Sequence, residues 1–257
     1  MNKIRQLINK RLPAGSFGRN VITLISGTTF AQVLLILVAP ILTRLYSPDD
    51  FGVYALYTSI ASIITVFACL SYDFAIVLPE KDDEAANVLC LSILICLCIS
   101  GLTIIPIALF HNQLAIVLNV PKLAACLWFV PLGVLGAGFF KAFNYWCTRR
   151  GQFKRLAARQ ITQSAITSAT QVGLGIIPSI GPGGLIGGLI IGQLAATGRL
   201  AWQIGKDEGV FLKSCISFKK LKRMAIRYKK FPLYDSWSEL FNTASTMLPT
   251  LLLGYFF

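Results

Sequence analysis

The sequence predicts an all-α fold: a polytopic membrane helix bundle with six complete transmembrane helices and the start of a seventh. Two observations lead to this prediction. Hydrophobic residues make up 55% of the 257 residues and charged residues only 14%, whereas about a quarter of a soluble domain is charged. The apolar residues also gather in stretches of ~20, the length that an α-helix needs to cross ~30 Å of hydrocarbon.

The expected spans follow one another at short intervals. Pro40 lies late in the first span, where a membrane helix tolerates it as a kink. The link between the fifth and sixth spans is so short that the sixth must return antiparallel to the fifth. In chain order the expected spans are residues 21–42, 51–72, 86–110, 123–145, 158–177 and 183–204, followed by the seventh segment, 233–257.

This pattern divides the chain into an N-terminal segment (1–20), a six-helix transmembrane lobe (21–204), a basic linker (205–232) and the seventh segment (233–257). In the linker, apolar residues at positions 218, 221, 225 and 228 form a helical stripe surrounded by cations. That pattern predicts an amphipathic helix on the membrane surface. The seventh segment runs outward and the chain stops with it, so we expect a fragment of a longer protein.

Lys and Arg are distributed unevenly between the loops. The N-terminal segment has five (Lys3, Arg5, Lys10, Arg11 and Arg19), the region from Lys141 to Arg159 has six, and residues 199–230 have ten. The opposite loops have only Arg44 and Lys122. Cytoplasmic loops collect Lys and Arg, so we expect a multi-pass protein of the bacterial inner membrane with a cytoplasmic N-terminus. The acidic loop at 80–84 falls on the same side, because acidic residues count little in this rule.

The net charge of +13 would suggest nucleic-acid binding in a soluble protein. Here the cations flank apolar spans, so we expect anionic inner-membrane lipids as partners and no nucleic acid. The seven cysteines lack zinc-type spacing and nearby histidines, which indicates apolar fillers and neither a metal site nor a cofactor. In the sixth span, Gly184, Gly188 and Gly192 predict close packing against the fifth. No Lys-Ser/Thr pair follows these glycines, so they do not form a nucleotide loop.

Three stretches together resemble one family. They read PILTRLYSPDDFGVY (40–54), YDFAIVLP (72–79) with an acidic continuation, and YKKFPLY (228–234) leading to LPTLLLGYFF (248–257). In kind, order and spacing the set resembles the polysaccharide and O-antigen flippases, the lipopolysaccharide biosynthesis proteins of the multidrug/oligosaccharidyl-lipid/polysaccharide exporter superfamily. The resemblance extends over essentially the whole chain.

The resemblance implies two six-helix lobes around a central cavity, of which this chain offers one. It also implies transport of undecaprenyl-diphosphate-linked oligosaccharide from the cytoplasmic to the periplasmic leaflet, without enzymatic activity. The expected partners are this lipid-linked oligosaccharide and other membrane proteins of polysaccharide assembly.

A carrier of such a cargo needs cations for the phosphates and hydroxyl or amide groups for the sugars. Ionisable residues within membrane segments are costly and are therefore the first candidates. Arg44 ends the first span, Asp73 follows the second, and Glu239 lies inside the seventh segment. Alternatively, Arg44 is an interfacial anchor and Asp73 a structural salt-bridge partner.

Polar residues recur at helical spacing along the fifth span. They point into a watery cavity or hold neighbouring helices together by hydrogen bonds, and both readings stay open. The candidates on this helix are Gln160, Gln163 and Gln171, with Thr167 and Thr170 between them. Asn242 adds a polar group near Glu239, and Lys141, Asn144 and Arg159 could recruit the diphosphate at the cytoplasmic mouth; for Lys141 and Arg159 the alternative is a purely topological role.

Two other functions were weighed. A membrane-embedded enzyme of envelope glycan assembly needs clusters of acids, histidines or metal ligands. The chain has one histidine, His111, and its acidic cluster at 82–84 is typical of the first turn of a helix. The other alternative is a remnant that does not transport.

Overall fold

The computed structural model describes residues 17–256, and within them the chain forms ten α-helices and no strand. The all-α class is therefore confirmed for this part of the chain. The expected N-terminal segment lies largely outside the described residues, including Lys3, Arg5, Lys10 and Arg11. The helices are α2 (Phe17–Leu45), α3 (Pro48–Val66), α4 (Asp82–Leu102), α5 (Ile104–Val117), α6 (Pro121–Leu127), α7 (Val130–Arg149), α8 (Phe153–Gly175), α9 (Pro182–Cys215), α10 (Phe218–Arg227) and α11 (Ser236–Phe256).

The outside of the bundle is apolar and part of its inside is polar, the reverse of a soluble protein. Ile36 on α2, Leu109 on α5 and Phe241 on α11 are each 66–70% exposed, whereas Asn87 and Gln171 are buried. A soluble monomer rarely exposes large contiguous apolar surface. The distribution is that of a membrane protein whose outer faces contact hydrocarbon.

Among the described helices, three are long and apolar enough to cross a membrane: α2 from Ile22, α4 and α9. The pair α6 and α7, bent by 50° at its junction, makes a fourth candidate if counted as one span. The other long helices, α3, α8 and α11, are not among these candidates. Within the described residues, length and apolarity thus support three spans, or four if the bent pair is one, and the expected six complete spans are not confirmed.

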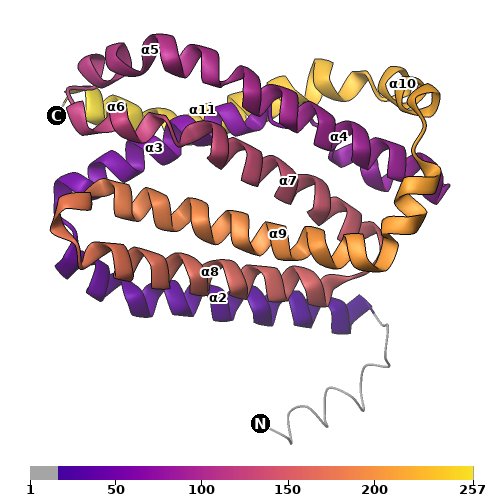
Figure 1. The fold of residues 1–257 in the computed structure, drawn as a ribbon, viewed down its shortest axis with the longest axis horizontal. Helices are drawn as coiled ribbons and strands as arrows, with labels where there is room; N and C mark the ends of the chain where they lie inside the picture. Colours follow the sequence, from indigo (N-terminus) through magenta and orange to yellow (C-terminus); the bar gives the residue numbers. More distant parts are fainter. Residues whose placement is uncertain (1–16, 257) are drawn as a thin grey trace, which may run out of the picture.

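Helix α9 is at the centre of the arrangement. It packs against α8 on one side and against α7, α3 and α4 on the other, while α2 packs on the outer face of α8 (Figure 1). Helix α11 lies along α3, and α10 packs on α4. We call the end where α7 ends and α4 and α8 begin the basic end, because it contains Arg149, Arg150 and the cations of α10.

Helices α8 and α9 approach so closely that two glycines of α9 are required. A Cβ atom at Gly192 would lie 2.8 Å from the backbone nitrogen of Thr167, and one at Gly188 would lie 3.0 Å from that of Gln171. The close packing predicted from the glycine pattern is confirmed at these two positions. Gly184 instead accommodates the ring of Tyr46, whose hydroxyl donates to the Gln171 carbonyl at 2.7 Å.

The second expected span ends earlier than the sequence indicated. Helix α3 stops at Val66, and Leu70 and Ser71 adopt left-handed backbone conformations, with φ of 47° and 56°. The Ser71 hydroxyl is hydrogen-bonded to that of Ser236 at 3.0 Å, which accounts for the turn because it ties this segment to the start of α11. The chain then continues through a short 3-10 helix, Phe74–Val77.

The third and fourth expected spans are each divided into two helices. The third is broken at Thr103, whose hydroxyl donates to the Ser100 carbonyl at 2.7 Å, while the Ser100 hydroxyl donates to the Pro131 carbonyl of α7 at 2.7 Å. The fourth is broken at residues 128–129, between α6 and α7. Local hydrogen bonding to carbonyls competes with the helical ladder at such points.

Much of the expected linker is helical. Helix α9 continues to Cys215, well beyond the predicted end at residue 204. On α10, Met224 is 1% exposed and packs with Tyr228 into the core beside α4 and α9, whereas Phe218 is 84% exposed. Met224 is not one of the four stripe positions, and Phe218 of the stripe is exposed, so the membrane-surface helix stays a prediction.

We expect the α8–α9 contact to be intolerant of added side-chain volume. Gly192→Ala places a methyl group against the backbone of Thr167, so the two helices must separate or shift. Overpacking of this kind lowers the free energy of unfolding by about 1–3 kcal/mol. Thermal unfolding of the purified protein in detergent measures the effect.

The matched control is Gly198→Ala on the same helix. Gly198 is exposed and a Cβ atom there meets nothing within 4 Å. Alanine is a better helix former than glycine by about 1 kcal/mol, so this variant should unfold at the same or a higher temperature. Equal melting temperatures for the two variants would contradict the tight contact.

Candidate functional site

A cavity of about 420 Å³ lies between α3, α7, α9 and α11. Its lining combines hydroxyl and amide groups with one pair of opposite charges and an apolar remainder. Such a mixture suits a ligand that has both neutral polar groups and a charged group. The polar lining residues are Tyr57, Thr58, Ser62, Thr65, Lys141, Gln193, Glu239, Asn242, Thr243 and Thr246.

The charged pair joins α7 to α11 across this cavity. Lys141 Nζ lies 2.7 Å from Glu239 Oε1, and each side chain is about a quarter exposed (25% and 26%). A pair in this partly desolvated position is stronger than an ion pair on an open surface, because water screens it less. Both groups still have an exposed edge, so a ligand in the cavity can reach them.

Asp73 lies behind the charged pair. It is 2% exposed, its Oδ2 atom has no hydrogen-bond partner among the described residues, and both Lys141 and Glu239 are close enough to act on it electrostatically. A buried carboxylate without full hydrogen bonding is costly. Two acids and one cation therefore share this region.

The entry into α11 is irregular, which sets the position of Glu239. Residues Phe231–Asp235 form a π-helical turn, with Pro232 as its second residue. Ser236 follows, 1% exposed and hydrogen-bonded to Ser71, and Glu239 comes one turn later. The strained turn at residues 70–71 and the π-turn thus meet beside the charged pair, and such irregular backbone concentrates at functional sites.

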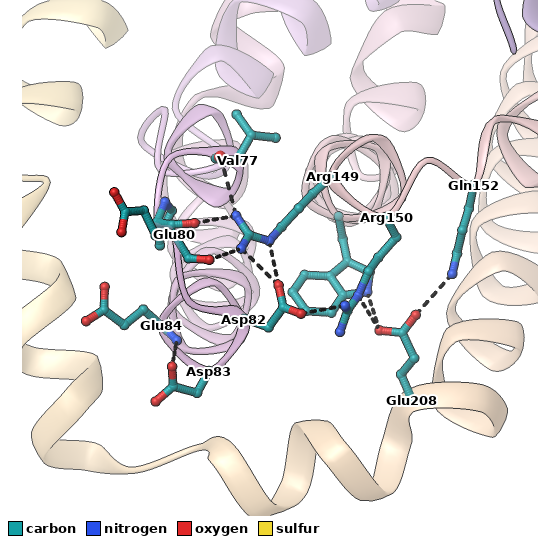
Figure 2. Close-up of polar contacts among 11 residues, drawn as sticks. Val77, Glu80, Asp82, Asp83, Glu84, Arg149, Arg150, Gln152 and Glu208 are labelled. Carbon is teal, nitrogen blue, oxygen red and sulfur yellow. Dashed lines mark hydrogen bonds and ion pairs between the residues drawn. The ribbon is translucent and has the colours of Figure 1, made fainter. Parts of the chain in front are cut away.

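A network of charges holds the basic end together (Figure 2). The guanidinium of Arg149 donates to Asp82 at 2.9 Å and to the Pro79 carbonyl at 2.6 Å. Arg150 bridges Asp82, at 2.7 Å, and Glu208 of α9, at 3.1 Å, as Figure 2 shows. The network ties the ends of α4, α7 and α9 to one another. Trp146, Gln152 and the Arg155–Asp207 pair extend it.

Helix α10 is fixed to the first turn of α4 by two more ion pairs. Lys220 contacts Asp83 at 2.9 Å and Arg227 contacts Glu84 at 3.0 Å. The hydrogen bond to the Asp83 carboxylate raises the pKa of the Lys220 ammonium, so Lys220 stays charged. The acidic cluster at 82–84 is indeed the first turn of a helix, as predicted, and it also anchors α10.

Three of the residues proposed from the sequence line the cavity: Lys141, Glu239 and Asn242. Asp73 adjoins their charges from a buried position. The seventh segment and the fourth span are far apart in sequence, so the helical pattern alone gave no sign that Lys141 and Glu239 form a pair.

The other candidates lie elsewhere. Arg44 is exposed at the end of α2 opposite the basic end. Gln171 is buried and donates to the Leu185 carbonyl at 2.9 Å, which is a hydrogen bond between α8 and α9. Gln160, Gln163 and Asn144 are half-buried and do not line this cavity, and Arg159 is buried between α7, α8 and α9.

Sequence reasoning missed the contribution of α3. Thr58, Ser62 and Thr65 of α3 face the cavity, and Gln193 of α9 joins them. The three hydroxyl residues are spaced by four and three positions, which is one face of a helix. That spacing is visible in the sequence and could have identified the polar face of the second span.

The described residues contain no group of three or more His, Cys, Asp or Glu side chains that could hold a metal ion. No curated protein and no solved structure matches the chain. Residues 41–257, most of the chain, match the model of a family described as polysaccharide biosynthesis protein. The chain therefore belongs to the polysaccharide biosynthesis protein family.

Proposed function

We propose that this protein carries lipid-linked oligosaccharide, joined to undecaprenyl diphosphate, from the cytoplasmic to the periplasmic leaflet of the bacterial inner membrane. The observation that supports the proposal most is the polar cavity between α3, α7, α9 and α11 in a protein of the polysaccharide biosynthesis family. Its apolar exterior faces lipid, while the polar groups are on the inside.

The lining matches the chemistry of a glycan. Sugar hydroxyls both donate and accept hydrogen bonds, and Thr58, Ser62, Thr65, Thr243 and Thr246 offer groups of the same kind. Gln193 and Asn242 add amides, which supply donors and acceptors in fixed directions. The apolar remainder of the lining suits the carbon faces of sugar rings.

The Lys141–Glu239 pair supplies the charge that a diphosphate needs. Glu239 neutralises Lys141 at 2.7 Å. A phosphate that enters takes the place of Glu239 as the partner of Lys141, and releases α11 from α7. The exchange couples cargo binding to the relative position of two helices, because the cargo binds the two arrangements with different affinity.

The proposed orientation places the basic end in the cytoplasm. There, the exposed cations Lys219, Lys222 and Arg223 of α10 face the anionic lipids of the inner leaflet. Other membrane proteins of polysaccharide assembly are the proposed protein partners.

Single cysteines in a cysteine-free background test this orientation. Ser179→Cys, in the exposed turn between α8 and α9, should react with a membrane-impermeant thiol reagent added to spheroplasts. Lys154→Cys, exposed near the basic end, should react only after the membrane is permeabilised. The opposite labelling pattern would reverse the proposed orientation.

Transport is tested in proteoliposomes with fluorescent lipid-linked oligosaccharide, whose accessibility to a reagent on one side reports translocation. Lys141→Gln should reduce the initial rate by about tenfold or more, because a charged hydrogen bond contributes about 1.5–3 kcal/mol. Glu239→Gln should also slow transport, because Lys141 then has no carboxylate partner that the phosphate can replace.

Lys154→Gln is the matched control, because Lys154 is exposed on α8 and lies outside the cavity. Its transport rate should equal that of the wild type. The mass of the recovered lipid-linked oligosaccharide must stay unchanged; a changed mass would show an enzyme instead of a carrier. Equal transport rates for the wild type and the Lys141 variant would contradict the proposed role of the cavity in transport.

A further inference from the structure

Arg159 of α8 is a buried cation without an anion. It is 5% exposed, and within the described part of the chain it forms no ion pair. Burying an unpaired charge is among the most costly arrangements in a protein. A purely topological role, the alternative noted from the sequence, does not require burial, because such residues remain in contact with water or headgroups.

The contacts of Arg159 hold its guanidinium in place but satisfy it poorly. The group lies over the ring of Phe140 of α7, 3.4 Å from the ring centroid, which fixes its plane. Its edge donates to Gln160 Oε1 and to Thr197 Oγ1 of α9, both at 3.4 Å, and Nε has no partner. Charge-assisted N–H···O bonds are normally about 2.7–2.9 Å long.

Arg149 provides a comparison within the same protein. Its guanidinium donates to a carboxylate at 2.9 Å and to a backbone carbonyl at 2.6 Å, so its charge and its donors are satisfied. Arg159 is more buried but has only neutral acceptors at long distance. A stacked guanidinium whose edge donors make only long hydrogen bonds to neutral groups can still bind a phosphate bidentately.

Two further polar side chains lie one helical turn away from Phe140 and from Arg159. Asn144 is four residues from Phe140 and lies on the same face of α7, and Gln163 is four residues from Arg159 on the same face of α8. Both are half-buried. Their amide groups, with the Thr197 hydroxyl, are donors of the kind that phosphate oxygens accept.

The position along the helix suits a lipid headgroup. Arg159 comes six residues after Phe153, the first residue of α8, which is roughly 9 Å along the helix axis at about 1.5 Å per residue. The group therefore lies near the basic end, which the proposed orientation places at the cytoplasmic side, where anionic headgroups gather.

We propose that Arg159, Gln160 and Thr197 form a site for a phosphate-type anion between α7, α8 and α9. Arg159 supplies the charge. Its N–H groups exchange their long hydrogen bonds to Gln160 and Thr197 for hydrogen bonds to the phosphate oxygens. None of the three lines the central cavity, so the site is separate from it. That the anion is the diphosphate of the cargo rests on the proposed function. That the site binds a phosphate group is independent of the proposed function.

The test measures thermal unfolding of the full chain in detergent with increasing sodium pyrophosphate, and separately with farnesyl diphosphate or phosphatidylglycerol in mixed micelles. Pyrophosphate should raise the melting temperature of the wild type in a saturable way. Arg159→Met should weaken pyrophosphate binding at least tenfold. Arg159→Lys keeps the charge but lacks the paired N–H donors of the guanidinium, so it should bind with intermediate affinity. Stabilisation by the lipids alone would assign the site to a membrane-bound phosphate.

The melting temperature of Arg159→Met in the absence of anions shows whether Arg159 serves ligand binding or stabilises the fold. If the charge serves a ligand, Arg159→Met removes an uncompensated buried charge, so the empty variant should unfold at the same or a higher temperature than the wild type. Arg199→Met is the control: Arg199 is exposed on α9, donates to Thr162 at 3.2 Å, and should leave anion binding unchanged.

Two results would overturn the site. One is the absence of any stabilisation of the wild type by either the free or the lipid-bound phosphates. The other is a lower melting temperature of Arg159→Met without anions, combined with an unchanged response to them, which would make Arg159 a structural partner of Phe140. Both results concern binding alone, so they are independent of whether the Lys141 variants transport.

Discussion

The ion-pair network at the basic end is the interaction on which the rest of the arrangement depends. Arg150 connects Asp82 at the start of α4 with Glu208 near the end of α9, and Arg149 caps the carbonyls that precede α4. Hydrophobic attraction between helices is weak in lipid, so polar links of this kind have a larger share in holding a bundle together. Because α7 is fixed at its end, Lys141, two turns earlier, has a defined position facing α11.

Helix α7 separates two polar regions that differ in how their charges are compensated. On one side Lys141 is paired with Glu239 in the central cavity. On the other, Phe140, its neighbour in sequence, supports the unpaired guanidinium of Arg159. A paired charge can change partners at little cost, whereas an unpaired buried charge retains a strong preference for any anion that reaches it. In the proposed function, the first charge exchanges its partner during transport, and in the proposed phosphate site the second binds an anion.

The polarity of each helix follows from its neighbours. Helices α3 and α11 line the cavity, and α8 is covered by α2 and α9, so these three tolerate hydroxyls, amides and even a charge. Helix α2 faces outward along most of its length and is correspondingly apolar. Helix α8, the least apolar of the long helices, is the one covered by α2 and α9, because a polar group in hydrocarbon needs a partner within the protein.

By itself the sequence determined the all-α class, the order of the helices, the gathering of cations at one end and the close contact of Gly188 and Gly192 with α8. These features depend on composition and on spacing within one helix, which the sequence contains directly. Only the tertiary structure decided that Glu239 meets Lys141, 98 residues away, that Gln171 donates a hydrogen bond to α9, and that Met224 of α10 is covered by protein. A helical pattern shows that a face is polar or apolar, but which neighbour covers that face depends on how all the helices pack.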